Sequence, residues 1–287
     1  MTDGKAANVL EGAMDSLFEP FALGDLRLPN RIAMAPMTRE FCPGGVPSQD
    51  VVDYYRRRAE GGTGLILTEG AAINRVGMRN EFIPRFYGND ALAGWKSVVD
   101  AVHAAGASIM PQLWHVGIQQ TDTVINPNTI KSKAEMIGPS GLTGLGETVG
   151  APMTQKQIDE TIADFGDATA AAARLGFDGI ELHGAHGYLL DQFLWNFTNR
   201  RSDAYGGGIA ERTRFATEVV RECRRRGGPG FPIVFRYSQW KIYDYGAQLA
   251  SVRWWTRAWT FSIVRPVGSI RLPFPAAPTI LRNGQRR

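Results

Sequence analysis

The sequence predicts an α/β protein in which helices cover a parallel sheet, and two observations lead to this class. Five short apolar segments alternate along the chain with segments whose apolar residues recur at helical spacing. The polar residues best suited to chemistry end or follow the apolar segments, which is where parallel sheets carry their active sites. Five strand–helix units within about 250 residues fit either a (β/α)8 barrel or a doubly wound sheet.

Each expected element has its own local signal. Strands are expected at 30–36, 64–69, 107–114, 177–183 and 232–238, and helices at 48–60, 90–105, 154–176, 189–195 and 210–226. Ser48 can cap the first helix, and Thr154 with Gln157 makes a capping box at the start of the third. The segment 115–152 is rich in Gly, Pro, Asn and Thr and is too long for a simple connector, so we expect a lid or a binding loop there.

Composition restricts the class of protein. Hydrophobic residues make up 44% and charged residues 21% of the chain, as in ordinary soluble globular proteins. No stretch reaches the ~18 consecutive apolar residues of a membrane helix, and the first residues lack the layout of a signal peptide. Cys42 and Cys223 are too few for a disulfide framework or a zinc cage, so we expect a cytoplasmic protein with no membrane partner.

The net charge of +4 comes from the last part of the chain. Residues 1–250 hold 25 Lys and Arg against 28 Asp and Glu, which gives −3, whereas residues 251–287 hold 7 Arg and no acidic residue. A face that binds nucleic acid would have its basic residues spread through the fold. We therefore expect no nucleic-acid partner.

Two histidines and a tyrosine follow the fourth expected strand. His183 and His186 form an H-x-x-H pattern, and Tyr188 comes two residues later. Two neutral imidazoles can bind a metal, but further ligands at the other strand ends are sparse. An isolated pair can also be one core and one surface histidine. Together with the phenol, the pair can hold a substrate oxyanion and deliver a proton, which is the interpretation that we favour.

Gln112 and Arg236 end different strands at the same edge of the sheet. A carboxamide offers a donor and an acceptor and suits the N–C=O edge of a heterocycle, while a guanidinium stabilises a developing anion or forms a structural ion pair. Trp114, Trp195 and Phe197 can line a substrate pocket. Packing is the more common role of aromatic residues near a core.

Several segments together resemble the old yellow enzyme family. They are NRIAMAPMTR (30–39), LTEGA (67–71), QLWHVG (112–117), ELHGAHGYLLDQFL (181–194), NRRSDAYGG (199–207) and VFRYSQW (234–240), in family order across residues 17–250. The family consists of FMN-dependent (β/α)8 TIM barrels that reduce activated alkenes with NADH or NADPH. The resemblance therefore implies a barrel, an FMN cofactor and a small-molecule substrate of the enone type.

The resemblance implies cofactor contacts residue by residue. The residues that would hold the flavin ring are Ala35, Pro36, Met37, Thr38, Gly70, Gln112 and Arg236. Among them, the Thr38 hydroxyl would hydrogen-bond flavin O4, Gln112 would bind the pyrimidine edge, and Arg236 would stabilise the reduced, anionic ring near N1. Gly70 would let the backbone approach the ring closely, and the first three residues would contact it through their backbone.

The resemblance also implies a substrate site. His183 and His186 would bind the carbonyl oxygen of an α,β-unsaturated carbonyl compound, and Tyr188 would protonate its α-carbon. Hydride would pass from flavin N5 to the β-carbon, and Trp114 would line the pocket. The cofactor would supply the difficult step, while the protein orients and polarises the substrate.

The resemblance stops near Ala250, and this point divides the chain. We expect an FMN-binding barrel portion over 1–250, with about five of the eight βα units, and a basic tail rich in Arg, Trp and Pro over 251–287. The tail has no βαβαβ pattern and is too short for three strands with crossover helices. A shifted reading frame in a longer gene would explain the tail, and a divergent C-terminus that caps the barrel differently is the alternative. The expected consequences are bare sheet edges at the first and fifth strands and weak or absent FMN binding, with a non-catalytic remnant as the alternative to an active enzyme.

Overall fold

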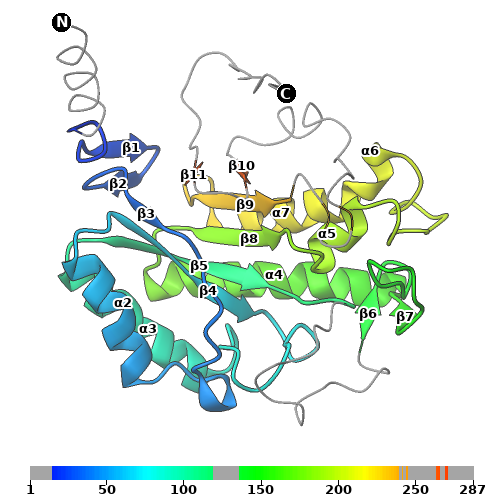
Figure 1. The fold of residues 1–287 in the computed structure, drawn as a ribbon, viewed down its shortest axis with the longest axis horizontal. Coiled ribbons are helices and arrows are strands. Elements are labelled where there is room, and N and C mark those ends of the chain that lie inside the picture. The colour runs from blue at the N-terminus through cyan, green and yellow to red at the C-terminus, as the bar shows by residue number, and fades with distance from the viewer. Residues whose placement is uncertain are drawn as a thin grey trace, which may run out of the picture.

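The computed structural model describes residues 15–118 and 136–238, Lys241 and Asp244, and the strand backbones of 263–265 and 269–270. Within these residues, the main sheet consists of β3 (Ala33–Met34), β4 (Leu65–Ala72), β5 (Ser108–Trp114), β8 (Ile180–Gly184), β9 (Ile233–Tyr237), β10 (Ile263–Arg265) and β11 (Ser269–Ile270). Their order is β11-β10-β9-β8-β5-β4-β3, and every neighbouring pair is parallel except β10 and β11 (Figure 1). The predicted parallel sheet is thus confirmed.

The five expected strands correspond to β3, β4, β5, β8 and β9. The last four of these are buried along their whole length, as is usual for parallel strands that are covered on both faces. β3 is shorter than the expected 30–36, and the chain becomes irregular from Ala35 onward. Pro36 explains this early end, because its nitrogen has no hydrogen to donate to a neighbouring strand.

A further parallel strand covers the outer edge of β9. Ile263 of β10 lies opposite Phe235, and Val264 lies opposite Arg236, while β11 returns antiparallel to β10. The expectation that the fifth strand would be a bare edge is therefore wrong, because a strand from the tail 251–287 pairs with it. The remainder of that tail lies outside the described residues. At the other end of the sheet, β3 pairs with β4 on one side and with none of the other described strands.

The expected helices are present at the expected places. They are α2 (Gln49–Glu60), α3 (Asn89–Ala104), α4 (Gln155–Leu175), α5 (Leu189–Leu194), α6 (Ile209–Arg212) and α7 (Arg214–Gly227), preceded by a short 3-10 turn, η1 (Pro43–Gly45). The helix expected at 210–226 is divided into α6 and α7 at Thr213. The capping box of Thr154 and Gln157 forms. Ser48 occupies the N-cap of α2, but its side chain makes no capping hydrogen bond.

The helices bury apolar faces against the sheet and against each other. α2 packs on α3 and β4, and α4 packs on α7 and β5. Large side chains of this core include Trp95, Phe165, Phe193 and Phe215. Burying each such side chain stabilises the fold by roughly 1.5–3 kcal/mol. Among the described residues, no helix is both long enough and apolar enough to cross a membrane.

A β-hairpin closes the amino-terminal end of the sheet. It consists of β1 (Phe21–Leu23) and β2 (Leu26–Leu28), which pair antiparallel. The hairpin shares a buried cluster with three strands, formed by Leu26, Leu28, Leu65, Leu67, Met110 and Val234. Two strands that contribute to this cluster, β4 and β9, are not neighbours in the sheet. The sheet therefore curls around an interior, as in an incomplete (β/α)8 barrel.

The segment 115–152 is described at its two ends. β6 (Ile137–Gly138) pairs with β7 (Ala151–Pro152) in a short parallel ladder. Arg201, in the loop after α5, donates hydrogen bonds to the carbonyls of Pro139 and Met153 at 3.0 and 2.7 Å. The described part is thus fastened to that loop, whereas residues 119–135 lie outside the described residues.

Candidate active site

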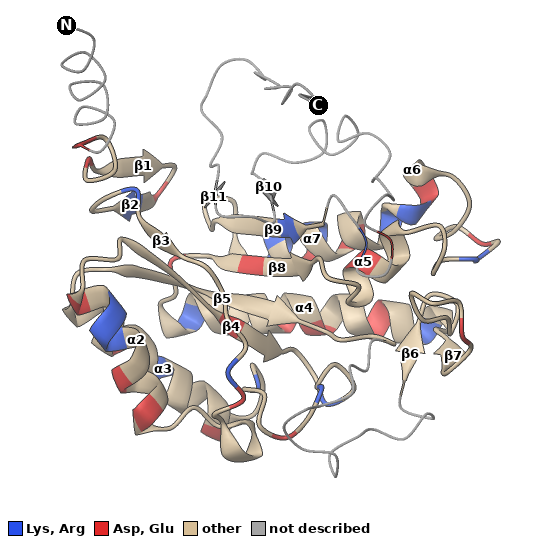
Figure 2. Cartoon of the chain, in the orientation of Figure 1, with Lys and Arg blue, Asp and Glu red and all other residues tan. Residues whose placement is uncertain are grey.

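The candidate site lies at the carboxyl halves of β5, β8 and β9. Gln112 of β5 is in register with Glu181 of β8, and His183 of β8 is in register with Arg236 of β9. Residues that lie side by side on neighbouring strands point to the same face of a sheet. Figure 2 shows acidic colouring on β8 and basic colouring on β9, its neighbour in the sheet. The strand order therefore brings together residues that are far apart in the sequence.

Glu181 joins the two residues that the sequence assigns to a heterocycle. Its Oε1 atom accepts a hydrogen bond from Gln112 Nε2 at 2.6 Å and one from Arg236 Nε at 3.0 Å. Glu181 is not among the site residues that the sequence predicts. The sequence does contain a signal for it, because an acidic residue within a buried strand is rare. Residues two apart in a strand also share a face, so Glu181 and His183 point the same way.

Four rings gather beyond this trio. The ring centroid of His183 lies 4.8 Å from that of Tyr188, 5.2 Å from that of His186 and 6.1 Å from that of Trp114. Trp114 and Tyr188 meet edge to face at 4.8 Å. The two histidines, the phenol and the indole named from the sequence therefore form one cluster, called here the ring cluster.

Burial keeps the two imidazoles of the ring cluster neutral. It lowers the pKa of His183 well below its usual value, and the neighbouring His186 and Arg236 lower that pKa further. Burial is also the main cause of the lowered pKa of His186, with Arg236 acting in the same direction. Burial raises the pKa of Tyr188, so the phenol keeps its proton. At neutral pH the cluster thus offers uncharged hydrogen-bond donors.

The backbone fixes the tautomer of His183. The N–H of Ala185 donates to His183 Nδ1 at 3.4 Å, so Nδ1 acts as an acceptor. In a neutral imidazole the other nitrogen then carries the hydrogen. His183 therefore presents an Nε2–H donor.

A strained turn places the second imidazole and the phenol. His186 has a φ of +59°, a left-handed conformation that is uncommon for residues other than glycine. Its N–H donates to Ser238 Oγ at 2.9 Å, and the N–H of Gly187 donates to Asp191 Oδ2 at 2.9 Å. Asp191 in turn forms a buried ion pair with Lys241. The turn between β8 and α5 is thus held from α5 and from the chain after β9.

The segment after β3 reaches the same end of the sheet. Ala35, Met37 and Thr38 are exposed and Pro36 is half-buried. Within the described residues, no hydrogen bond or ring contact joins these four to the ring cluster. The next residue anchors them, because the N–H of Arg39 donates to the buried Glu69 at 3.0 Å and its guanidinium pairs with the same carboxylate. The segment therefore offers exposed residues at the end of the sheet that carries the site.

Gly70 lies directly against the side chain of Trp114. A Cβ atom at this position would lie 2.5 Å from the Trp114 side chain. The glycine therefore makes room for the indole of Trp114. Trp195 and Phe197 lie apart from the ring cluster, with their rings stacked on each other at 5.1 Å.

The free donors and acceptors of Gln112 and Arg236 suit the pyrimidine edge of a flavin. The hydrogen bond to Glu181 occupies one N–H of Gln112, which leaves its carbonyl oxygen and a second N–H for a ligand. Arg236 spends its Nε–H on Glu181, and its terminal nitrogens make no hydrogen bond to any part of the chain that the structure describes. The Trp114 Nε1 atom is buried and also without a partner there. An amide and a guanidinium fork together match the alternating donors and acceptors of such a ring.

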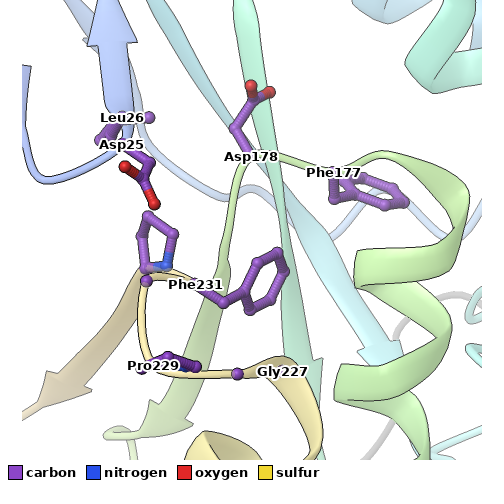
Figure 3. A pocket seen from close by; sticks show the side chains of 10 residues that line it. Asp25, Leu26, Phe177, Asp178, Gly227, Pro229 and Phe231 are labelled. Atoms are coloured by element: carbon purple, nitrogen blue, oxygen red, sulfur yellow. The ribbon is translucent and has the colours of Figure 1, made fainter.

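A cavity of about 370 Å³ lies at the opposite end of the strands. Asp25, Phe177, Asp178 and Phe231 are among its lining residues (Figure 3). The Asp178 carboxylate is already engaged, since it accepts from Ile109 N–H at 2.8 Å and pairs with a histidine. Parallel barrels place their chemistry at the carboxyl ends of the strands, so this cavity is not the candidate site. The described residues contain no group of three or more His, Cys, Asp or Glu that could hold a metal.

Comparison with known proteins identifies the family. The sequence profile of the NADH:flavin oxidoreductase / NADH oxidase family matches residues 16–261. The chain belongs to this family. The match extends past Ala250, where the motifs found by inspection stop. Members of the NADH:flavin oxidoreductase family use FMN, with NADH or NADPH as the reductant.

Several relatives cover most of this chain. 12-Oxophytodienoate reductase 7 of Oryza sativa subsp. japonica is 38% identical over 215 residues, or 71% of this chain and 54% of that protein. The chanoclavine-I aldehyde reductase fgaOx3 of Penicillium roqueforti is 37% identical over 235 residues, or 80% of this chain and 62% of that protein. The chain thus spans about half the length of the curated relatives that it matches.

Solved structures of the family have the same fold. Morphinone reductase in complex with tetrahydroNAD superposes with a TM-score of 0.69 and 34% identity, covering 78% of this chain and 64% of that one. An old yellow enzyme homologue from Zymomonas mobilis gives a TM-score of 0.68 and 31% identity, covering 78% and 63%. The resemblance to old yellow enzymes and the barrel-type fold are thereby confirmed.

Proposed function

We propose that this chain carries the flavin and substrate sites of an FMN-dependent oxidoreductase that uses NADH or NADPH to reduce the activated C=C bond of α,β-unsaturated carbonyl compounds. The observation that carries the proposal is the position of the ring cluster next to the trio of Gln112, Glu181 and Arg236. The names of two relatives support the substrate class, because a 12-oxophytodienoate and a morphinone both contain a carbonyl group.

The trio and the segment after β3 provide the cofactor site in this proposal. Gln112 and Arg236 hold the pyrimidine edge, and the exposed backbone of Ala35, Pro36 and Met37 together with the Thr38 hydroxyl lies along the ring. Gly70 contributes by seating Trp114, which forms a wall of the pocket. FMN held there would supply the hydride transfer from a reduced nicotinamide to the substrate.

The two imidazoles bind and polarise the substrate. His183 and His186 each donate one hydrogen bond to the carbonyl oxygen, and these bonds strengthen as negative charge develops there. Because both rings are neutral, neither transfers a proton to that oxygen prematurely. The withdrawal of electrons toward the oxygen makes the β-carbon electrophilic.

Tyr188 delivers the proton that completes the reduction. Its phenol is protonated at neutral pH, because burial raises its pKa. It lies against both His183 and Trp114, so a substrate whose oxygen meets the imidazoles has its α-carbon within reach of the phenol. A positioned acid of this kind contributes about 10²–10⁴-fold to the rate.

The test is an assay of NADH or NADPH oxidation with the purified chain and added FMN. Oxidation that depends on both FMN and a simple enone such as 2-cyclohexen-1-one, with the saturated ketone as product, is the expected result. A chain that binds FMN but reduces no enone contradicts the substrate class. A chain that retains no flavin and has no activity supports the alternative, a non-catalytic remnant of such an enzyme. Weak FMN binding and a cytoplasmic setting stay predictions from the sequence.

A further inference from the structure

Glu181 is a fully buried carboxylate at the centre of the proposed flavin site. Because it is buried, it does not face a substrate. It lies on β8 between Gln112 of β5 and Arg236 of β9, and none of its surface is exposed. One of its oxygens, Oε1, accepts hydrogen bonds from both neighbours. Such a shared acceptor ties the orientation of one side chain to that of the other.

The hydrogen bonds determine which atoms the two neighbours present. The Gln112 amide must turn its nitrogen toward the carboxylate, so its carbonyl oxygen faces away as an acceptor. The Arg236 guanidinium is planar, and fixing its Nε–H direction also fixes the plane of the two terminal nitrogens. Without the carboxylate, the amide can flip and the guanidinium can rotate, so ligand binding would have to order both.

Burial raises the pKa of Glu181, while the ion pair with Arg236 and the hydrogen bond from Gln112 favour its charged form. That charge also acts on the site. The guanidinium of Arg236 cannot lose its proton, and Glu181 is the carboxylate that pairs with it. The second oxygen, Oε2, is buried and has no partner among the described residues, so the carboxylate is incompletely compensated. A negative charge at this distance weakens the attraction of Arg236 for an anionic ring.

We propose that Glu181 is the positioning residue of the flavin site: it fixes the ligand-facing atoms of Gln112 and Arg236 and offsets the positive charge of Arg236, which lowers the midpoint potential of bound FMN. The proposal rests on the function proposed above. It predicts that geometry and charge can be separated by two substitutions. Glu181→Ala removes both, whereas Glu181→Gln keeps a hydrogen-bond acceptor of the same shape and removes the charge.

The experiment measures FMN affinity by quenching of flavin fluorescence, and the two-electron potential of FMN with the protein in excess. Glu181→Ala is expected to weaken FMN binding tenfold or more. Glu181→Gln is expected to bind FMN within about threefold of the original chain but to shift the potential to a more positive value. A tenfold gain in the binding of reduced over oxidised flavin corresponds to about 30 mV.

Asp178→Asn is the matched control, since it neutralises another carboxylate near β8 at the opposite end of the strands. Its affinity and potential should equal those of the original chain, and circular dichroism shows whether each variant is folded. A double variant, Glu181→Ala with Gln112→Ala, should lose little more affinity than the more damaging single variant, because the two residues act together.

Two results would contradict the proposal, and they differ in whether the proposed function also fails. If the original chain binds FMN and both Glu181 variants match it in affinity and in potential, the role of Glu181 is wrong while the proposed function stands. If the folded original chain does not bind FMN at any concentration, the proposed function is wrong and the role of Glu181 is wrong with it.

Discussion

The protonation states of the ring cluster follow from burial. His183 and His186 lie next to each other and near Arg236, so a proton on either ring would sit in a buried environment close to the positive charge of Arg236. Both imidazoles are therefore neutral at neutral pH, and each ring has one N–H group that can donate a hydrogen bond. Tyr188 is the residue of the cluster that retains an acidic hydrogen. These assignments make separate predictions for the phenol and for the imidazoles.

Tyr188→Phe removes the proton donor and keeps the ring that packs on Trp114. In the FMN-loaded chain, enone reduction should fall by about 10²-fold or more, while oxidation of NADH or NADPH by the flavin continues at the original rate. Rapid-mixing measurement of the two half-reactions checks this. The matched control is Tyr54→Phe on α2, which should leave both rates unchanged. Equal slowing of both half-reactions by Tyr188→Phe would contradict the role of the phenol.

The lowered pKa of His183 makes the stability of the fold depend on pH. Below pH ~6.5 the unfolded chain binds a proton that the buried ring resists, so the free energy of unfolding falls as the pH decreases toward the folded-state pKa. One such group contributes up to about 1.4 kcal/mol per pH unit. Urea unfolding at about pH 7.5 and about pH 5.5 should show that His183→Asn loses less stability on acidification than the original chain.

His103 is the control for that prediction, because its pKa moves the other way. The hydrogen bond that its ring donates to Asp178 raises its pKa, so its contribution to stability is fully present below pH ~6.5 and is lost as the pH rises through the folded-state pKa. His103→Asn should therefore lose more stability on acidification than the original chain. The same response from both variants would contradict the assigned pKa directions.

At the scale of elements, the turn between β8 and α5 depends on residues beyond β9. Lys241 and Asp191 form an ion pair in which both side chains are almost completely buried, and Asp191 also accepts the N–H of Gly187. Removing one member of such a pair leaves an uncompensated buried charge, which costs about 3–5 kcal/mol. The pair thus links the stability of the fold to the position of His186 and Tyr188.

Lys241→Met tests this link. The free energy of unfolding, measured with urea, should fall by about 3–5 kcal/mol, and adding Asp191→Asn should recover part of the loss because the buried charge is then gone. Lys156→Met on the exposed face of α4 is the control, with an expected change within ±0.5 kcal/mol. A change of that small size for Lys241→Met would show that the buried ion pair does not support the turn.

The elements were predictable because each has a strong local signal. Buried strands are mostly apolar segments, and the capping box of Thr154 and Gln157 marks the start of α4 directly. Features that depend on partners were not predictable. Nothing local shows that Gly70 faces Trp114, or that α6 and α7 separate at Thr213, since both follow from how neighbouring elements pack.

At the scale of the whole molecule, the curled sheet depends on the β1–β2 hairpin. Leu28→Ala removes a buried side chain from the cluster that this hairpin shares with β4, β5 and β9. The expected loss in the free energy of unfolding is about 2–5 kcal/mol. Phe18→Ala, at an exposed position near the same end, should change it by no more than about 0.5 kcal/mol. Urea unfolding measures both, and equal effects would mean that the hairpin does not support the sheet.

The arrangement of the molecule was predictable in outline. Alternating strands and helices gave the parallel sheet, and polar residues at strand ends gave the edge where His183, Gln112 and Arg236 meet. The pairing of β10 with β9 was missed, because its short segment lies in a basic tail without alternating strand and helix patterns. Glu181 was missed because its importance lies in two hydrogen bonds across the sheet, which depend on the order and register of three strands.

The most direct test of the account is FMN binding by the purified full chain, followed by the quenching of flavin fluorescence. The account predicts saturable quenching at one FMN per chain, weakened tenfold or more by Arg236→Ala and unchanged by Asp178→Asn. Fluorescence that stays constant as folded protein is added, or quenching that is the same for all three chains, would contradict a flavin site built on β5, β8 and β9.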